Sequence, residues 1–189
     1  VIVLTGAGEK AFCAGADMAE AAFLPDGAER RDFAAQAVAR LARVRKPVIA
    51  AMNGHAIGIG LTLALQCDLR LAARDAKYGV VQVRRGMMPD CGSHWTLPRL
   101  VGFARAADLL LTGRRFLGSE AVELGLASRA LPATEVLPAA LEIARDIQQG
   151  ILPNAAPTLE GFDIAGWNKP ADQTGGDLFD FIEVATGRV

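Results

Sequence analysis

Two glycine-flanked turns are the segments of this sequence best suited to chemistry. The first runs from Lys10 to Met18 and the second from Asn53 to Gly60, and each follows a short apolar run. Their small residues let a ligand approach the backbone closely. The second turn leads into a predicted helix whose first amides lack intrahelical partners. Two such amides converging on one point would polarise a carbonyl group and hold the negative oxygen that forms on it. The alternative is an ordinary pair of strand-to-helix turns, because short glycine patterns are common.

Alternating strands and helices are predicted to position these turns. Apolar runs predict buried strands at 1–4 and 47–52, and a third strand is predicted at 68–72. Helical spacing, glycine stops and a capping serine at Ser119 predict helices over 29–44, from the second turn through Gln66, over 104–112, from Ser119 to Gly125, and over 137–149. The order of these elements favours an α/β architecture.

Composition excludes several classes of protein. The chain has 189 residues, of which 51% are hydrophobic, and a formal net charge of −1. These values are those of a globular protein of one domain or slightly more, neither disordered nor a dedicated nucleic-acid binder. Three scattered cysteines predict no disulfide framework and a reducing cytoplasm. We expect no membrane span and no signal peptide. Because Val1 already lies in an apolar run, we expect the chain to be cut from a longer one.

Several motifs in order resemble the crotonase superfamily, also called the enoyl-CoA hydratase/isomerase family. The matching stretches are 1–8, 12–17, 46–54, 58–60, 67–69, 97–102 and 121–126. The resemblance covers residues 1–148 and implies a crotonase-like ββα spiral core, here incomplete at both its N-terminal and C-terminal sides. It further implies binding of an acyl-CoA thioester as substrate, no cofactor, and a homotrimer if the full domain is present.

The resemblance also implies which residues act. The two oxyanion-hole amides of the family fall on Ala16 and on Ile59, where many relatives have glycine. The stretch that contacts coenzyme A in the family, with the rest of the predicted substrate-binding set, falls on Ala14, Ala16, Asp17, Met18, Ala19, Ile59, Thr62 and Gln82.

The acid–base residues depart from the family's hydratases, which use two glutamates. Their positions hold Thr62 and Gln82 here, and neither side chain can act as a general base near neutral pH. Asp90 matches an aspartate that several isomerases of the family use to shuttle a proton, and its surroundings resemble isomerases of phenylacetyl-CoA breakdown. The resemblance therefore implies an isomerase with Asp90 as the catalytic acid–base. The alternative for Asp90 is an N-cap of the following helix.

Other reactive side chains are given structural roles. We interpret Asp17 as a loop-stabilising residue and Cys91 as a packing residue, and we expect His55 and His94 to be structural or solvated because neither has a companion cluster. For Trp95, a place in the acyl pocket and a role in helix packing both remain open.

Residues 139–189 resemble the start of a bacterial PP2C-type serine/threonine phosphatase domain, on the motif Gly175-Gly176-Asp177 and Asp180-Phe181. Residues 151–189 carry six acidic and two basic side chains, and two β-like runs lie at 162–167 and 178–184. We therefore place a second, incomplete domain at 149–189, with a short β-containing tail. Asp177 would hold Mn²⁺ or Mg²⁺ only if that domain were complete, so no metal site is predicted.

Three hypotheses follow for function. The first is an acyl-CoA-binding, cytoplasmic enoyl-CoA isomerase that stabilises a thioester enolate. The second is an acyl-CoA sensor that regulates a fused phosphatase. The third is a hydratase in name only, or an inactive fragment.

Overall fold

The computed structural model describes residues 1–16, 41, 43–153, 155–158, 160–161 and 163–166. The chain divides into two compact units, residues 1–140 and residues 141–189. The first unit contains both β-sheets and every residue discussed below as part of the candidate site.

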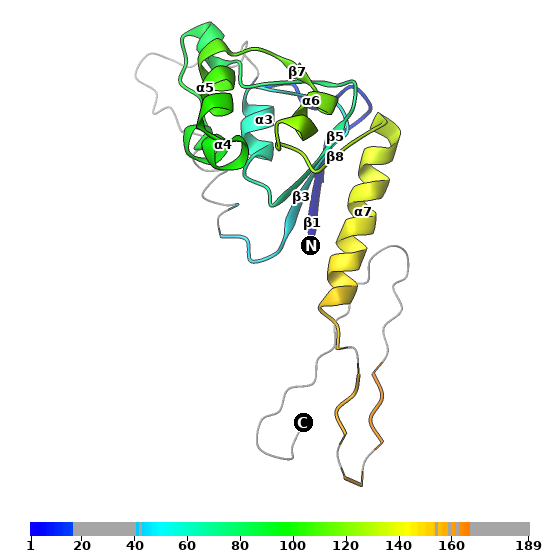
Figure 1. Ribbon diagram of the computed structural model, residues 1–189. Coiled ribbons are helices and arrows are strands. Elements are labelled where there is room, and N and C mark those ends of the chain that lie inside the picture. The colour runs from blue at the N-terminus through cyan, green and yellow to red at the C-terminus, as the bar shows by residue number, and fades with distance from the viewer. Residues whose placement is uncertain (17–40, 42, 154, 159, 162, 167–189) are drawn as a thin grey trace, which may run out of the picture. The chain divides into compact units, whose positions relative to one another are not determined.

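The first sheet has four parallel strands in the order β1-β3-β5-β8 (Figure 1). Its strands are β1 (Ile2–Thr5), β3 (Val48–Met52), β5 (Leu69–Ala73) and β8 (Arg129–Leu131). Every residue of β3 is buried. A continuous apolar run is typical of a central strand in a parallel sheet, since helices or a second sheet cover both of its faces.

The second sheet has the order β2-β4-β6-β7, in which only the β6–β7 pair is antiparallel. Its strands are β2 (Ala11–Cys13), β4 (His55–Ile57), β6 (Lys77–Gly79) and β7 (Phe116–Leu117). The predicted turns 10–18 and 53–60 therefore each contain a strand that the sequence reasoning did not foresee. Strands of only three residues are too short to show a detectable alternation, and their pairing partners lie far away in the sequence.

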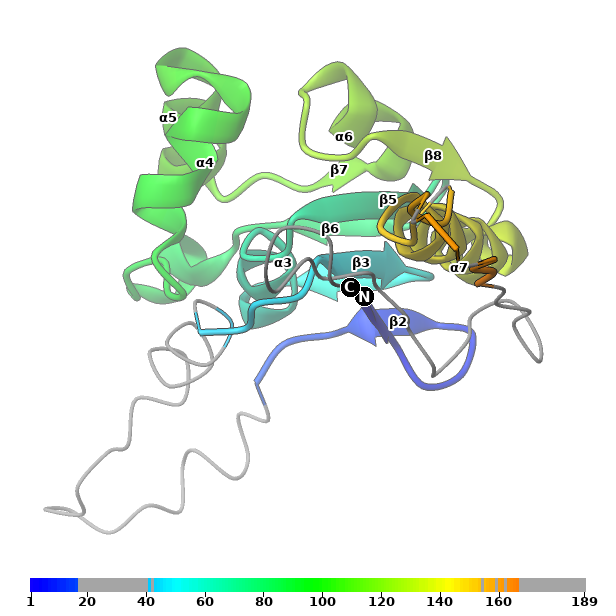
Figure 2. The same cartoon turned by 90° about the horizontal axis from the view of Figure 1, so that it is seen from below.

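Helices follow the strand pairs. They are α3 (Ile59–Ala64), the short 3-10 helix η1 (Gln82–Arg85), α4 (Ser93–Val101), α5 (Phe103–Thr112), α6 (Gly118–Glu123) and α7 (Ala133–Gly150). The order β3-β4-α3 is one ββα unit, and β5-β6 followed by η1 and α4 is the next. Helices α4 and α5, both green, lie side by side in both views (Figures 1 and 2).

The predicted strands and most predicted helices are confirmed within one to four residues at their ends. One detail is wrong. Ser119 does not cap α6, because the helix begins at Gly118 and its cap residue is Leu117, with no capping side chain. A Cβ at Gly118 would lie 2.1 Å from the carbonyl oxygen of Ala73, so close packing on β5 fixes this helix start. The predicted helix 29–44 lies almost entirely outside the described residues.

The two sheets are joined through the phenol of Tyr78, which is fully buried. Its hydroxyl lies 3.2 Å from the carbonyl oxygens of Met52 and Ala73, so a residue of the second sheet is bonded to β3 and β5 of the first. Its ring stacks on Phe116, with 6.1 Å between the centroids. Burial raises the pKa of Tyr78, and the phenol therefore stays protonated as a donor.

The second unit is described only in part. Helix α7 contains the boundary between the units and ends at Gly150. Residues 163–166 belong to the predicted β-like run 162–167 and form no strand, while the run 178–184 lies outside the described residues. Among the described helices, none has the length and apolar character needed to cross a membrane.

Candidate active site

Two close backbone approaches hold the two glycine-flanked turns together. A Cβ at Gly60 would lie 2.2 Å from the carbonyl oxygen of Cys13, and a Cβ at Gly54 would lie 2.5 Å from that of Lys10. Any larger residue at either position would push the segments apart. Glycine is therefore what allows the start of α3 and the end of β2 to lie side by side.

Side-chain hydrogen bonds fix the same region. The amide nitrogen of Asn53 donates to the carbonyl oxygens of Gly6 and Gly8, at 3.1 and 2.8 Å, and its oxygen accepts from the Gly6 N–H at 3.0 Å. Gly15 and Gly58 have φ angles of 119° and 59°, which a residue with a side chain rarely adopts. These two glycines directly precede the two predicted oxyanion-hole residues, Ala16 and Ile59.

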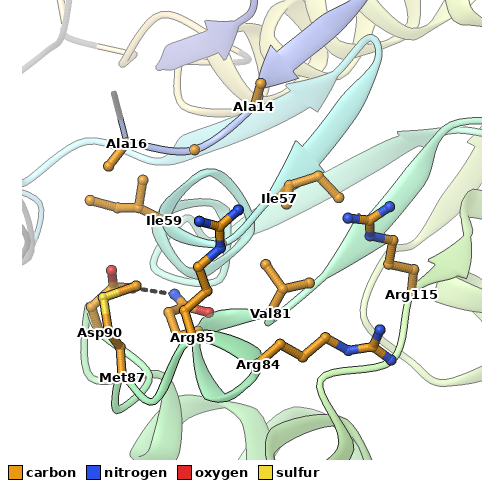
Figure 3. Close-up of a pocket in the computed structure, with 13 residues that line it drawn as sticks. Ala14, Ala16, Ile57, Ile59, Val81, Arg84, Arg85, Met87, Asp90 and Arg115 are labelled. Atoms are coloured by element: carbon orange, nitrogen blue, oxygen red, sulfur yellow. Dashed lines mark hydrogen bonds between the residues drawn. The ribbon is translucent and has the colours of Figure 1, made fainter. Parts of the chain in front are cut away.

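A cavity of about 450 Å³ lies where the two segments meet (Figure 3). Its lining residues come from the first turn, from the β4–α3 junction, from η1 and its flanks, and from the segment before β7: Ala14, Gly15, Ala16, Ile57, Gly58, Ile59, Val81, Gln82, Arg84, Arg85, Met87, Asp90 and Arg115. The volume is within the usual range for a small-molecule site.

The predicted oxyanion-hole residues both line this cavity. Within the described part of the chain, the backbone N–H groups of Ala16 and Ile59 donate no hydrogen bond to another residue. Ile59 is the first residue of α3, so its N–H is one of the amides that a helix leaves unpaired. Among the described residues, no carbonyl oxygen of the protein therefore competes for these two N–H groups.

Asp90 is the one carboxylate among the cavity-lining residues that the structure describes. Its Oδ1 atom accepts a hydrogen bond from the Gln82 side-chain amide at 2.9 Å, drawn as a dashed line in Figure 3. The same Oδ1 accepts from the hydroxyl of Thr62, which is completely buried. Thr62 and Gln82, at the two positions where the family's hydratases have glutamate, therefore both donate hydrogen bonds to Asp90.

The alternative reading of Asp90 as a helix N-cap is wrong. Helix α4 begins after Gly92, a residue in the left-handed conformation, and no side chain caps it. Asp90 contributes only its backbone carbonyl there, which accepts from the Ser93 N–H at 2.9 Å. The Asp90 carboxylate is consequently free to face the cavity.

Gln82 has a second feature. Its side chain is 6% exposed, and its Oε1 atom is buried without a hydrogen-bond partner among the described residues. Because Nε2 is engaged by Asp90, Oε1 is the group that remains for a donor. A buried acceptor with no partner carries a free-energy penalty, so this position favours a ligand or water with a hydrogen-bond donor.

Not every predicted residue lines the cavity. Ala14, Ala16, Ile59, Gln82 and Asp90 do, whereas Thr62 reaches the site only through its bond to Asp90. The predicted substrate-binding residues Asp17, Met18 and Ala19 lie outside the described residues, as does Asp177.

The sequence reasoning missed the cationic residues of the cavity. Arg84 and Arg85 follow Gln82 in η1, and Arg115 precedes β7. The proximity of the two η1 arginines to Gln82 in sequence was a usable signal. Arg115 had none, because only the antiparallel pairing of β6 with β7 brings it near.

The other candidate side chains have structural contacts. His55 Nδ1 accepts from the Lys77 N–H at 2.9 Å, and Cys91 is buried, as expected for a packing residue. Trp95 is 60% exposed, lies outside the cavity lining and stacks against Arg99, whose guanidinium carbon is 3.8 Å from the ring centroid. Within the described residues, no three His, Cys, Asp or Glu side chains gather as a metal site would require.

Known protein families and solved structures resemble most of this chain. The family model for enoyl-CoA hydratase/isomerase matches residues 1–161. The chain belongs to this family. The fold is accordingly the crotonase-like α/β fold that the motifs implied.

Individual relatives agree with this membership. The enoyl-CoA hydratase/isomerase chain is 44% identical over 147 residues to the human mitochondrial enoyl-CoA hydratase domain-containing protein 2, covering 76% of this chain and 50% of that protein. It is 44% identical over 150 residues to the probable enoyl-CoA hydratase echA8 of Mycobacterium leprae, covering 78% and 57%. The solved structure of a probable enoyl-CoA hydratase/isomerase from Mycobacterium abscessus superposes with a TM-score of 0.73 at 55% identity, covering 81% of this chain and 59% of that one.

These matches limit what carries over. The chain spans about half the length of the curated relatives that it matches. The phosphatase-like resemblance of residues 139–189 receives no support, and the family match continues through residue 161, beyond the start predicted for that domain. The association with phenylacetate breakdown also receives none. One of these relatives is a mitochondrial protein, so the cytoplasmic location of this chain stays a prediction.

Proposed function

We propose that the chain provides the catalytic core of an enoyl-CoA isomerase, which moves a carbon–carbon double bond by one position in an acyl-CoA. The observation that carries the proposal is the convergence of Thr62 and Gln82 on the carboxylate of Asp90. An isomerase needs one proton carrier, and the described cavity lining offers one carboxylate.

In this proposal the thioester carbonyl accepts hydrogen bonds from the N–H groups of Ala16 and Ile59. Removal of a proton from the carbon next to the thioester, or from the carbon beyond the double bond, moves an electron pair toward the thioester oxygen. The resulting enolate oxygen is negative, and two fixed donors stabilise it more than they stabilise the neutral carbonyl.

Asp90 would accept that proton and return it to a different carbon, so that atoms and electrons balance without an oxidant or an added water. Its two oxygens are not equivalent. Oδ1 accepts from both Gln82 and Thr62, and these two hydrogen bonds hold the carboxylate in place. Oδ2 is the oxygen that we assign to the travelling proton.

A hydratase is the second candidate, and the unpartnered Oε1 of Gln82 is the observation that favours it. A water molecule held between Gln82 Oε1 and Asp90 could add to the double bond. The described lining residues include a single carboxylate, and this argues against a hydratase. Water addition needs one group to activate water and another to deliver a proton.

One experiment separates the two candidates. The chain is given a β,γ-unsaturated hexenoyl-CoA and its α,β-unsaturated isomer, and the products are quantified as the other isomer and as the hydroxyacyl-CoA. We expect isomerisation to exceed hydration, and Asp90→Asn to lower isomerisation by roughly 10²- to 10⁴-fold. Asp75→Asn, at an exposed carboxylate outside the cavity, is the matched control. Hydration faster than isomerisation, or full isomerisation by Asp90→Asn, would refute the proposal.

A further inference from the structure

The cavity has a cationic side that double-bond migration does not use. Arg84, Arg85 and Arg115 line it, and among the described lining residues the one acidic side chain is Asp90, so these described residues carry a net charge of +2. In the close-up, the guanidinium groups of Arg85 and Arg115 extend toward Ile57, while Asp90 lies beside Ile59 and Ala16 (Figure 3).

Among the described residues, none of these three guanidinium groups forms an ion pair. The ion pairs found among the described residues involve Arg114 and Arg145, and none joins a cavity arginine to Asp90. Arg84 donates from Nε to the Thr112 carbonyl oxygen at 3.3 Å, which orients it, and its terminal nitrogens make no bond to a described residue. Arg85 and Arg115 donate to no described side chain or carbonyl.

Unpaired arginines grouped in one cavity favour an anionic ligand. A planar guanidinium binds a carboxylate through two parallel hydrogen bonds, and such charge-assisted bonds are about twice as strong as neutral ones.

Two anions could reach this position: a second carboxylate on the acyl group, or a phosphate of coenzyme A. The cavity volume favours the first. The arginines share one cavity of about 450 Å³ with the amides proposed to hold the thioester. The phosphates of coenzyme A are separated from the thioester by the entire pantetheine arm, whereas a carboxylate at the far end of a short acyl chain lies only a few carbon atoms away.

We propose that Arg85 and Arg115, supported by Arg84, form a carboxylate-binding subsite, and that the preferred substrates are thioesters of short dicarboxylic acids. This specificity rests on the proposed function, since it takes Ala16 and Ile59 as the site of the thioester. The apolar side chains of Ile57 and Val81 also line the cavity, between Arg85 and Arg115 in the view of Figure 3, and would contact the methylene groups of the acyl chain.

Direct binding tests the subsite without requiring catalysis. The probes are the saturated coenzyme A thioesters of pentanedioic acid and of pentanoic acid, which differ by a carboxylate in place of a methyl group, measured by calorimetry. We expect the dicarboxylic thioester to bind roughly 10- to 100-fold more tightly, the effect of a hydrogen-bonded charge. Arg85→Gln and Arg115→Gln should each reduce that ratio by about 10-fold.

The controls identify the source of the anion. Arg85 and Arg115 are exposed, so their replacement should not unfold the chain, and Arg105→Gln, at an exposed arginine of α5 outside the cavity, should leave the ratio unchanged. Equal binding of both thioesters would overturn the proposal. So would an equal loss of affinity for both probes in Arg85→Gln, which would assign the arginine to a coenzyme A phosphate. Full isomerase activity in Asp90→Asn, together with an unchanged binding ratio, would refute the proposed reaction and leave the carboxylate subsite supported.

Discussion

The side-chain amide of Gln82 donates a hydrogen bond to Oδ1 of Asp90 across 2.9 Å. The two residues are eight positions apart in the sequence, and η1 and the loop that follows it bring them together. The amide supplies a donor where a glutamate would supply a competing negative charge. This hydrogen bond, with the one from Thr62, fixes the position of the Asp90 carboxylate in the cavity.

Replacing Gln82 with glutamate should disturb the acid–base chemistry rather than the fold. In Gln82→Glu, the new carboxylate would lie at hydrogen-bond distance from that of Asp90. Two like charges so close repel each other, so one of the two groups should keep its proton to higher pH. We expect the acidic limb of the kcat/KM profile for isomerisation to move upward by about one pH unit or more.

Gln82→Met is the matched variant, since it removes the donor without adding a charge. Its acidic limb should move less than that of Gln82→Glu, because no second carboxylate is placed beside Asp90. Identical profiles for the two variants would show that charge at this position has no influence on Asp90.

Gly60→Ala should damage both stability and activity. The added Cβ would lie 2.2 Å from the Cys13 carbonyl oxygen, so β2 and α3 must separate and the Ile59 amide must move. We expect unfolding to become easier by about 2 kcal/mol or more, measured by urea denaturation.

Gly102→Ala provides the comparison for that variant. Gly102 has a φ of 83° and no atom within 4 Å of a built Cβ, so only backbone strain is added. Because its ψ is 159°, a combination essentially restricted to glycine, the cost should be roughly 1–3 kcal/mol, with the catalytic rate retained. A rate loss in Gly102→Ala equal to that in Gly60→Ala would contradict the assignment of the Gly60 effect to the active-site backbone.

Tyr78→Phe should weaken the connection between the sheets. The variant removes the hydroxyl that lies 3.2 Å from the carbonyl oxygens of Met52 and Ala73, in a fully buried position. We expect a loss of about 1–2 kcal/mol in the free energy of unfolding. An unchanged denaturation midpoint would mean that the hydrogen bonding of the Tyr78 hydroxyl does not contribute to stability.

Alkaline pH should destabilise the fold through Cys67. Burial raises the pKa of its thiol from 9.0 to about 11, with Arg70 opposing and Asp68 adding to the shift. Because the folded-state pKa is the higher one, the stabilisation is complete below pH 9 and is lost as the pH rises toward 11. The loss should be on the order of 2 kcal/mol.

The free energy of unfolding of the wild type and of Cys67→Ala, measured at several pH values in that window, checks this. The variant lowers stability at every pH by leaving a small cavity, but its curve should fall less steeply as the pH rises. Parallel curves would exclude the Cys67 thiol as the source of the pH dependence.

Local sequence determined much of this protein. The apolar runs predicted β1 and β3 because a buried parallel strand needs continuous apolar residues, which β3 shows along its full length. The glycine pattern located both backbone turns, and the motifs identified the family that the comparisons show. Each of these signals is carried by neighbouring residues, so no distant partner is needed to read it.

Only the tertiary structure decided how these parts combine. Strands β2 and β4 are too short to show a period, and they exist because they pair with each other across 44 residues, Ala11 with His55. The same is true of the site. Asp90 looked equally suited to capping a helix until Thr62 and Gln82 were found to bond its carboxylate, and Arg115 joins Arg85 in one cavity through the pairing of β6 with β7. Such convergence depends on chain segments that are distant in sequence, and their distances are set by packing.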